Sequence, residues 1–235
     1  MMIPTFVQNG LLASIVTSIT FLILFLLGYL NQKKIISNEA SRKVVHIGAG
    51  TLFLAIYFYN DRGLFSKYFN VFHNVLWTGI LLWKSRNSNS GEKQSDLVVD
   101  TMTRGRRRRE LLCGPLVFNI VAIICGTILY RTVVASIIMG VLTWGDGLAA
   151  VIGSRYGSQR KIYGSKSLDG SLTCFFAGFL ASIIYISLLV NFQSVHLLQI
   201  CVIAFSAAVI EAISPSDLDN LTIPLSIFIL YYFLF

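Results

Sequence analysis

An acidic residue, Asp146, lies inside an otherwise apolar run of the sequence. The run covers residues 137–152, is long enough to enter a bilayer, and holds no other charged residue. A carboxylate at the centre of a membrane costs about 2.5–3.5 kcal/mol on insertion scales, so it is kept where a cation, a metal ion or a polar cavity stabilises it. Gly145 and Gly147 flank it and let backbone and carboxylate approach a ligand closely. We interpret Asp146 as part of a functional site within a membrane protein.

Small residues follow Asp146 at helical spacing. Gly153 and Gly157 fall on the same helix face as Asp146, which gives a smooth strip with a carboxylate at one end. We expect Gly145, Gly147, Gly153 and Gly157 to allow a nucleotide to approach. Close helix packing is the alternative explanation for Gly153 and Gly157, but it does not explain Asp146.

A cationic cluster, Arg42, Lys43 and His46, occurs earlier in the chain. The three residues lie within about one helical turn, so His46 shares a face with Arg42 or Lys43. These side chains could hold phosphate. The alternative is a basic anchor at the membrane surface.

A third cluster opens an expected helix with Lys166 and Ser167, followed by Gly170 and Ser171. Ser167 or Ser171 can cap the helix, and the free N–H groups of a helix start bind phosphate. Lys166 adds a point charge suited to phosphate oxygens. An ordinary helix start without a ligand is the alternative.

A fourth cluster holds Glu211, a second acid within an apolar run, followed by Asp219 and Asn220. Asp219 and Asn220 precede a run in which Pro224 suits the first turn of a helix. With Asp146, these acids provide carboxylates that could hold Mg²⁺.

The composition indicates the elements that must position these clusters. Hydrophobic residues make up 55% of the 235 residues and charged residues 13%, whereas soluble domains carry about 25% charged residues. Apolar runs near the length of a membrane span recur along the chain. We therefore predict an all-α, polytopic membrane bundle of about seven or eight transmembrane helices, forming one membrane-embedded domain over 1–235. The runs cover 11–30, 44–59, 70–83, 111–130, 132–152, 171–190, 195–213 and 221–235.

The basic residues predict the orientation of the runs. If every run crosses, segments 31–43, 84–110 and 153–170 share one side and hold 16 of the 19 Lys and Arg residues. The positive-inside rule makes that side cytosolic and places all four clusters on it. The net charge of +8 is thereby explained without nucleic acid.

The segment 84–110 is the longest polar stretch. We expect its first part, Lys84 to Lys93, to be disordered. Its last part, Arg104 to Arg109, abuts the membrane and should bind anionic lipid. A clamp for a phosphate-bearing substrate is the alternative for these arginines.

Carboxylates and cations on one side of a membrane predict phosphoryl transfer. Mg²⁺ and basic side chains hold a polyphosphate, and the reaction needs mainly positioning and charge neutralisation. The second substrate must come from the bilayer, which suggests a lipid alcohol. The rival interpretation is an ion-coupled transporter that uses Asp146 and Glu211, but the chain shows no internal repeat.

At these residues the sequence resembles the CTP-dependent lipid kinase family, which includes phytol, farnesol, dolichol and diacylglycerol kinases. Four pieces carry the resemblance in order: 42–50, 143–153, Lys166-Ser167 with Gly170-Ser171, and Glu211 followed by 219–225. The segment 109–116 is most similar to the phytol and farnesol kinase branch.

The resemblance implies phosphoryl transfer from CTP to a prenol, with a diacylglycerol or dolichol kinase as the alternative. It implies catalytic importance for Arg42, Lys43, Asp146, Gly153 and Lys166. We expect Asp146 to bind Mg²⁺ or to act as the base, and Glu211 and Asp219 to complete the metal site, in a site facing the cytosol. We expect the endoplasmic reticulum, because the N-terminus lacks transit-peptide character; a plastid or a bacterial inner membrane is the alternative. A homodimer is compatible with the sequence.

Overall fold

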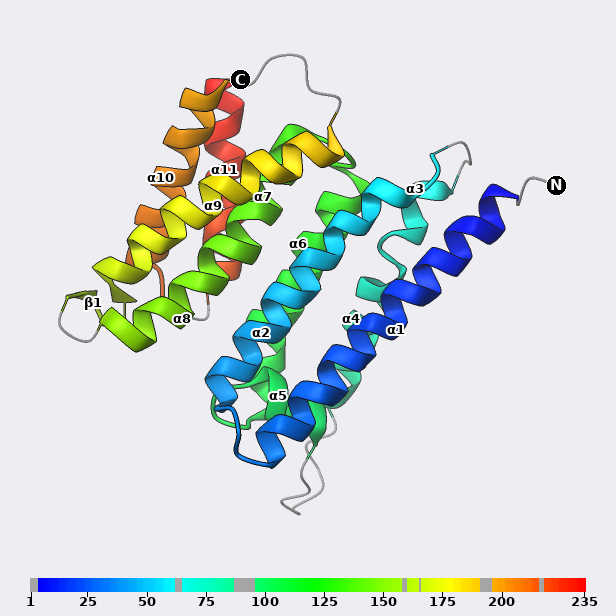
Figure 1. Ribbon diagram of the computed structural model, residues 1–235, viewed down its shortest axis with the longest axis horizontal. Coiled ribbons are helices and arrows are strands. Elements are labelled where there is room, and N and C mark those ends of the chain that lie inside the picture. The colour runs from blue at the N-terminus through cyan, green and yellow to red at the C-terminus, as the bar shows by residue number, and fades with distance from the viewer. Residues whose placement is uncertain are drawn as a thin grey trace. The chain divides into compact units, whose positions relative to one another are not determined.

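The computed structural model describes residues 4–61, 65–86, 96–157, 160–164, 166–190, 196–215 and 218–235. The chain forms two compact units, Met1–Ile128 and Leu129–Phe235. Both consist of helices, apart from one short hairpin in the second unit (Figure 1). The all-α prediction is therefore confirmed. That the two units act as one kinase domain stays a prediction.

The first unit contains long helices that run back and forth, joined by short ones (Figure 1). The interior is apolar: Leu24 and Leu27 of the first helix pack with Val45, Trp77 and Leu81. The elements are α1 (Thr5–Gln32), α2 (Asn38–Thr51), the 3₁₀ segment η1 (Leu52–Phe58), α3 (Ser66–Phe69), α4 (Phe72–Arg86), α5 (Leu97–Met102), the 3₁₀ segment η2 (Arg108–Leu112) and α6 (Gly114–Thr127).

The second unit is built around one long helix, α9, that packs along a broken helix and along α10 (Figure 1). The broken helix consists of α7, a π-helical turn and α8. The elements are α7 (Val133–Gly140), η3 (Val141–Gly145), α8 (Asp146–Tyr156), β1 (Lys161–Tyr163), β2 (Lys166–Ser167), α9 (Leu168–Leu189), α10 (Leu197–Ile213) and α11 (Asp219–Leu234). β1 and β2 pair antiparallel as a hairpin between α8 and α9.

Side-chain caps fix several helix starts. Ser37 accepts a hydrogen bond from the backbone N–H of Ala40 at the start of α2, and Asp96 accepts from Val98 and Val99 at the start of α5. Ser167 accepts from Gly170 at the start of α9. Such caps satisfy N–H groups that have no partner within the helix. Ser167 thus caps α9 as the sequence predicts.

Within the described residues, helical segments cover most of each of the eight apolar runs in the sequence. Four helical stretches are long and apolar enough to cross a membrane: Thr5–Gln32, Arg108–Thr127, Val133–Tyr156 and Leu168–Leu189. Leu197–Ile213 and Asp219–Leu234 are shorter apolar helices. The protein is a membrane protein, and its helices expose apolar side chains such as Phe25, Phe176 and Phe205.

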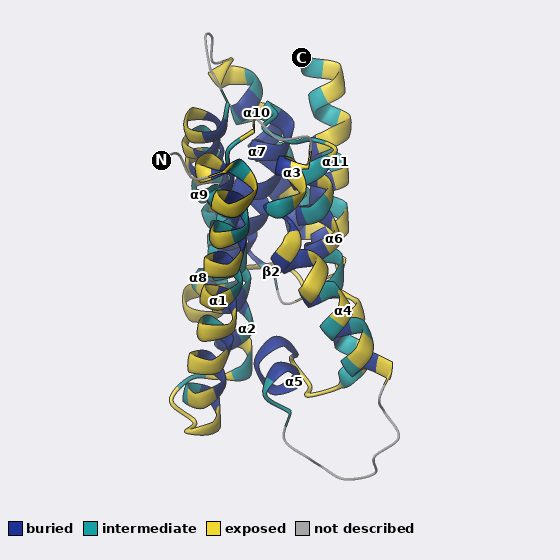
Figure 2. Ribbon diagram, turned by 90° about the vertical axis from the view of Figure 1, so that its right-hand side faces the viewer, coloured by how far each residue is buried: buried dark blue, intermediate teal, exposed yellow. Residues whose placement is uncertain are grey.

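The segment 84–110 departs from the expected polar loop. Residues 84–86 continue α4, and Val98 to Met102 of α5 are all buried, so α5 is drawn almost wholly in dark blue in Figure 2. The structure describes the rest of the segment except 87–95, where most of the predicted disorder falls. The physical reason for the difference is that Val98, Val99 and Met102 pack into the apolar core of the first unit.

Candidate functional site

Asp146 is the first residue of α8 and follows directly on the π-helical turn of η3. A π turn widens the helix locally and is frequent at functional sites. The side chain is almost completely buried, with an exposed fraction of 1%. The fold therefore holds a carboxylate at a break in a helix, inside the second unit.

Lys166 stands at the centre of the polar cluster of this unit. Its ammonium group forms a short ion pair with Glu211 Oε1 and lies 3.7 Å from Asp219 Oδ2. The exposed fractions are 14% for the Lys166 side chain, 4% for Glu211 and 3% for Asp219. Glu211 of α10, 45 positions after Lys166, and Asp219 of α11 thus meet around one largely buried cation of β2.

The electrostatics of this cluster appear in the pKa of Lys166, which lies on the hairpin outside the candidate membrane spans. Burial by itself lowers that pKa, because it disfavours the charged form. The carboxylates of Glu211 and Asp219 outweigh burial, with a smaller contribution from Asp146, and the pKa of Lys166 rises above its ordinary value. Lys166 is therefore charged at neutral pH, and three of the predicted site residues, Glu211, Asp219 and Asp146, stabilise its charge.

Asn220 and Ser171 lie close to this cluster along the chain. Asn220 is buried, and its backbone N–H donates to Asp219 Oδ1 at 2.9 Å. The Ser171 hydroxyl donates to the backbone carbonyl of Ser167 within the first turn of α9. The structure thus brings Asp146, Lys166, Glu211, Asp219 and their sequence neighbours into one unit, and their roles in a common site stay a prediction.

The predicted nucleotide-binding glycines lie where helices α8 and α9 touch. A Cβ atom added at Gly145 would lie 2.9 Å from the backbone oxygen of Cys174, and one at Gly170 would lie 3.0 Å from the backbone oxygen of Ala149. A Cβ atom at Gly153 or Gly157 would meet the Ser167 hydroxyl. Close packing therefore accounts for these four glycines, and their role toward a nucleotide stays a prediction. Gly147 is buried at the start of α8.

The cationic cluster of α2 belongs to the first unit. Lys43 is buried, with 3% of its surface exposed, while Arg42 and His46 are half-buried. The His46 ring packs on Phe118 of α6, with 4.4 Å between the ring centres. The burial of Lys43 does not suit a simple anchor in the headgroup layer. A phosphate-binding role for these three residues stays a prediction.

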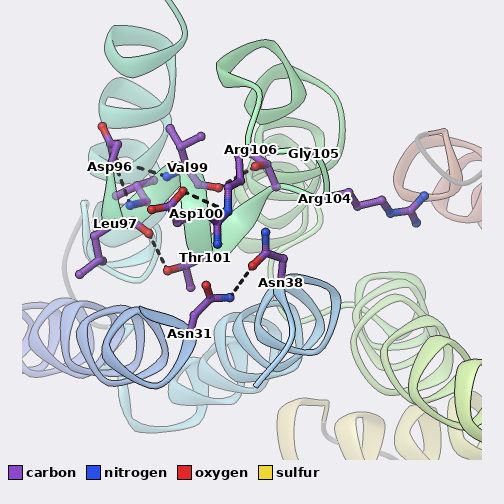
Figure 3. A network of polar contacts seen from close by, with 12 residues as sticks. Asn31, Asn38, Asp96, Leu97, Val99, Asp100, Thr101, Arg104, Gly105 and Arg106 are labelled. Atoms are coloured by element: carbon purple, nitrogen blue, oxygen red, sulfur yellow. Dashed lines mark hydrogen bonds and ion pairs between the residues drawn. The ribbon is translucent and has the colours of Figure 1, made fainter. Parts of the chain in front are cut away.

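A second polar network surrounds α5 in the first unit (Figure 3). Lys84 Nζ donates to Asp96 Oδ2 at 2.6 Å, and Asn31 Nδ2 of α1 donates to Asn38 Oδ1 of α2 at 2.9 Å. Lys84 and the capping N–H groups lower the pKa of Asp96, although burial alone would raise it. These contacts fasten α5 to the helix ends, which is a structural role.

The arginine segment Arg104 to Arg109 is partly fixed by the same network. The backbone N–H groups of Arg104 and Gly105 donate to Glu110 Oε2 at 2.7 and 2.9 Å, and Arg106 Nε lies 3.6 Å from Asp100 Oδ1. Arg106 remains 60% exposed. An exposed basic segment suits contact with anionic lipid, which stays a prediction, as does the alternative of a phosphate clamp.

The acids of the second unit suit Mg²⁺ by their chemistry, since Mg²⁺ prefers carboxylate oxygens. Among the described residues, however, no group of three Asp, Glu, His or Cys side chains is arranged to hold a metal ion. Glu211 and Asp219 instead contact Lys166. Mg²⁺ commonly binds through one or two carboxylates plus substrate phosphates, so the residues fit a metal ion that arrives with a nucleotide.

Two features of this architecture were not predicted from the sequence. Thr143 lies in the π turn, is completely buried, and its hydroxyl has no hydrogen-bond partner within the described part of the chain. Asp96 and Asp100 hold the α5 network together. The spacing of Asp96 before Val98 and Val99 is a helix-cap signal that could have revealed α5.

No family model matches the sequence, and no solved structure matches it. Curated proteins do. The phytol kinase of Synechocystis is 31% identical over 198 residues, which are 83% of this chain and 79% of that protein. The chloroplastic farnesol kinase of Arabidopsis thaliana is 30% identical over 236 residues, with 94% of this chain and 75% of that protein covered.

A third relative is a probable phytol kinase 1 of Glycine max, named as chloroplastic. It is 31% identical over 216 residues, which are 88% of this chain and 70% of that protein. The three alignments cover most of the chain in both units, and all three names are those of prenol kinases. They favour the kinase interpretation over the ion-coupled transporter. The chain therefore belongs to the lipid kinase family, in the branch of phytol kinase and farnesol kinase.

Proposed function

We propose that this protein transfers the γ-phosphoryl group of CTP to the hydroxyl group of a prenol, phytol or farnesol, and releases the prenyl monophosphate and CDP. The observation that carries the proposal is the buried cluster of Asp146, Lys166, Glu211 and Asp219 in a chain of the phytol and farnesol kinase branch. A permanent ammonium ion among carboxylates suits a reaction whose charge lies on phosphate oxygens.

Each residue has a role in this reaction. The oxygen of the alcohol attacks the γ-phosphorus, the bond from that phosphorus to CDP breaks, and the hydroxyl proton leaves to a base. Lys166 holds phosphate oxygens, while Glu211 and Asp219 orient its ammonium group. Asp146 either accepts the proton or holds the metal ion, and the two roles are separated by experiment below.

Mg²⁺ would neutralise charge on the phosphates of CTP when bound. We propose Asp146 as its main protein ligand, because Glu211 and Asp219 contact Lys166 directly.

Arg42 and Lys43 of the first unit are proposed as further phosphate ligands. Loss of activity in Arg42→Ala, with unchanged expression, would support this.

An activity assay tests the function directly. The purified protein with CTP and Mg²⁺ is expected to phosphorylate phytol or farnesol, measured with labelled CTP and a panel of lipid alcohols that includes diacylglycerol and dolichol. CTP with Mg²⁺ should also raise the thermal unfolding midpoint, because a ligand that binds only the folded protein stabilises it. Absence of product from every alcohol with every nucleoside triphosphate would refute the proposal.

The finer topology is also a proposal: seven or eight crossings, with 31–43, 84–110 and 153–170 on the cytosolic side. Single cysteines are placed at the exposed positions Lys33, Tyr163 and His196 in a cysteine-free protein. Lys33 and Tyr163 should be labelled from one side of a sealed vesicle, and His196 from the other side. Labelling of Lys33 and Tyr163 from opposite sides would contradict the predicted topology.

The membrane that houses the protein is the last part of the proposal. Two of the three relatives above are named chloroplastic, and the third comes from a cyanobacterium. These names favour the plastid or bacterial alternative over the endoplasmic reticulum. Fractionation of cells that express a tagged protein tests the choice.

A further inference from the structure

An apolar groove of about 400 Å³ runs along the second unit between α9 and α10. Its size lies in the range of small-molecule sites, about 300–1,000 Å³. Only one of its lining residues, Ser171, is polar. Its apolar lining includes Ile162, Leu168, Leu172, Phe176, Phe205 and Ala212.

The groove and the polar cluster are built from the same elements. The hairpin places Ile162 in the groove and Lys166 in the cluster. Helix α10 places Ala212 in the groove and Glu211, the preceding residue, against Lys166. The groove residues Leu168 and Ala212 therefore lie within two positions of Lys166 and Glu211 along the chain, which brings one end of the groove close to the polar cluster.

The walls of the groove differ in character. The floor near Glu211 is made by small side chains: Ala208 and Ala212 are 4% and 6% exposed, and Ala208 packs against Ala149 and Cys174. Aromatic rings stand farther away, with Phe175 and Phe205 edge to face at 5.9 Å between ring centres. A small floor leaves room for a branched chain, and aromatic walls offer it a large apolar contact area.

We propose that this groove binds the prenyl chain of the substrate and directs its hydroxyl group to the Lys166 cluster. The inference rests on the proposed function and adds that this groove is the surface that selects the substrate. From Leu168 beside the cluster to Phe176, the groove extends about 12 Å along α9, at about 1.5 Å per residue. It therefore holds the isoprene units nearest the hydroxyl group, and the remainder of the chain continues into the bilayer.

A bulky side chain in the middle of the groove tests this assignment. Leu172 is 46% exposed and lies one helical turn beyond Leu168. Leu172→Trp is expected to lower kcat/KM for farnesol and phytol by at least about 10-fold. The five-carbon dimethylallyl alcohol ends before this position, so its kcat/KM should change by less than about 3-fold.

The matched control lies in the neighbouring groove between α10 and α11, where Ile229 is 47% exposed. Ile229→Trp adds the same side chain to a lipid-facing surface and should leave the ratio of farnesol to dimethylallyl alcohol unchanged. An equal loss on all alcohols in Leu172→Trp, or a change of the ratio in Ile229→Trp, would overturn the assignment.

A second measurement does not depend on turnover. A farnesol analogue with a diazirine on the isoprene units nearest the hydroxyl group is expected to crosslink to residues 168–176 or 205–213, and excess farnesol should displace it. Crosslinks that farnesol does not displace would show only bulk lipid in the groove and would overturn the inference. A wild-type protein that phosphorylates no alcohol refutes the proposed function instead, and the crosslinking result distinguishes the two failures.

Discussion

Replacement of Asp146 by Asn is expected to lower kcat/KM for CTP and farnesol by at least about 100-fold, the lower limit for loss of a positioned acid–base group. The substitution keeps nearly the same shape and removes the carboxylate charge. Lys166 retains its contacts with Glu211 and Asp219, so the thermal midpoint without nucleotide should stay close to that of the wild type. Stabilisation by CTP with Mg²⁺ should shrink.

Asp169→Asn is the matched control. Asp169 lies in the first turn of α9, but its side chain is 27% exposed and pairs at 3.7 Å with Arg160. Exposed ion pairs contribute little, and activity should stay near that of the wild type. Near-normal turnover in Asp146→Asn would give the carboxylate a structural role, and the mechanism would have to rest on Glu211 and Asp219.

A cysteine at the same position separates the two roles of Asp146. Thiolates favour soft metal ions over Mg²⁺. If Asp146 holds the metal ion, Asp146→Cys should be inactive with Mg²⁺ and recover with Cd²⁺. If Asp146 is the base, Cd²⁺ should not restore activity, and the pH profile of Asp146→Cys should shift toward the higher pKa of a thiol.

Replacement of Lys166 by Met has the largest expected effect on stability, about 3–5 kcal/mol, because it leaves buried carboxylates without their cation. Activity should be lost as well. The raised pKa of Lys166 means that the ammonium ion stabilises the folded protein at every pH below the ordinary lysine value, and that this stabilisation is lost only as the pH rises through the higher folded value. The loss of thermal midpoint in Lys166→Met should therefore be constant across neutral pH.

Two further variants allow the Lys166→Met result to be interpreted. Lys161 lies on the same hairpin but is exposed, so Lys161→Met should leave both stability and activity nearly unchanged. The double variant Lys166→Met with Glu211→Gln removes one of the carboxylate charges that have lost their cation. It should recover part of the stability but none of the activity. A Lys166→Met protein as stable as the wild type would contradict the charge arrangement described here.

Much of the fold could be predicted from the sequence because the apolar runs of this membrane protein satisfy their backbone hydrogen bonds by forming helices. The expected runs at 132–152 and 171–190 correspond to α7–η3–α8 and α9. The π turn before Asp146, which packs on α9, could not be predicted, because no residue pattern marks it. Helix α5 was missed because six residues are too few for a clear period.

The candidate site was predicted in part for a similar reason. Buried acids are costly in a membrane, so Asp146 and Glu211 stood out by residue type alone. Spacing along the chain does not reveal partners that are 45 residues apart, such as Lys166 and Glu211. Composition also does not distinguish a glycine that makes room for a ligand from one that allows a neighbouring helix to pack closely. At Gly145 the nearest atoms belong to α9, so close packing applies there.

Where η3 and α8 contact α9, glycine backbone packs against backbone. This contact determines which positions of the enzyme can be substituted and which cannot. At Gly145 and Gly170 any larger residue meets main-chain atoms, which cannot turn aside as side chains do. The contact of η3 and α8 with α9, beside the proposed phosphate site, therefore tolerates few substitutions. The α10 side of the groove meets α9 through side chains, so under the proposed assignment substitutions there can change which alcohol is accepted while that contact is preserved. New substrate ranges should therefore arise, in evolution or in the laboratory, through changes on α10.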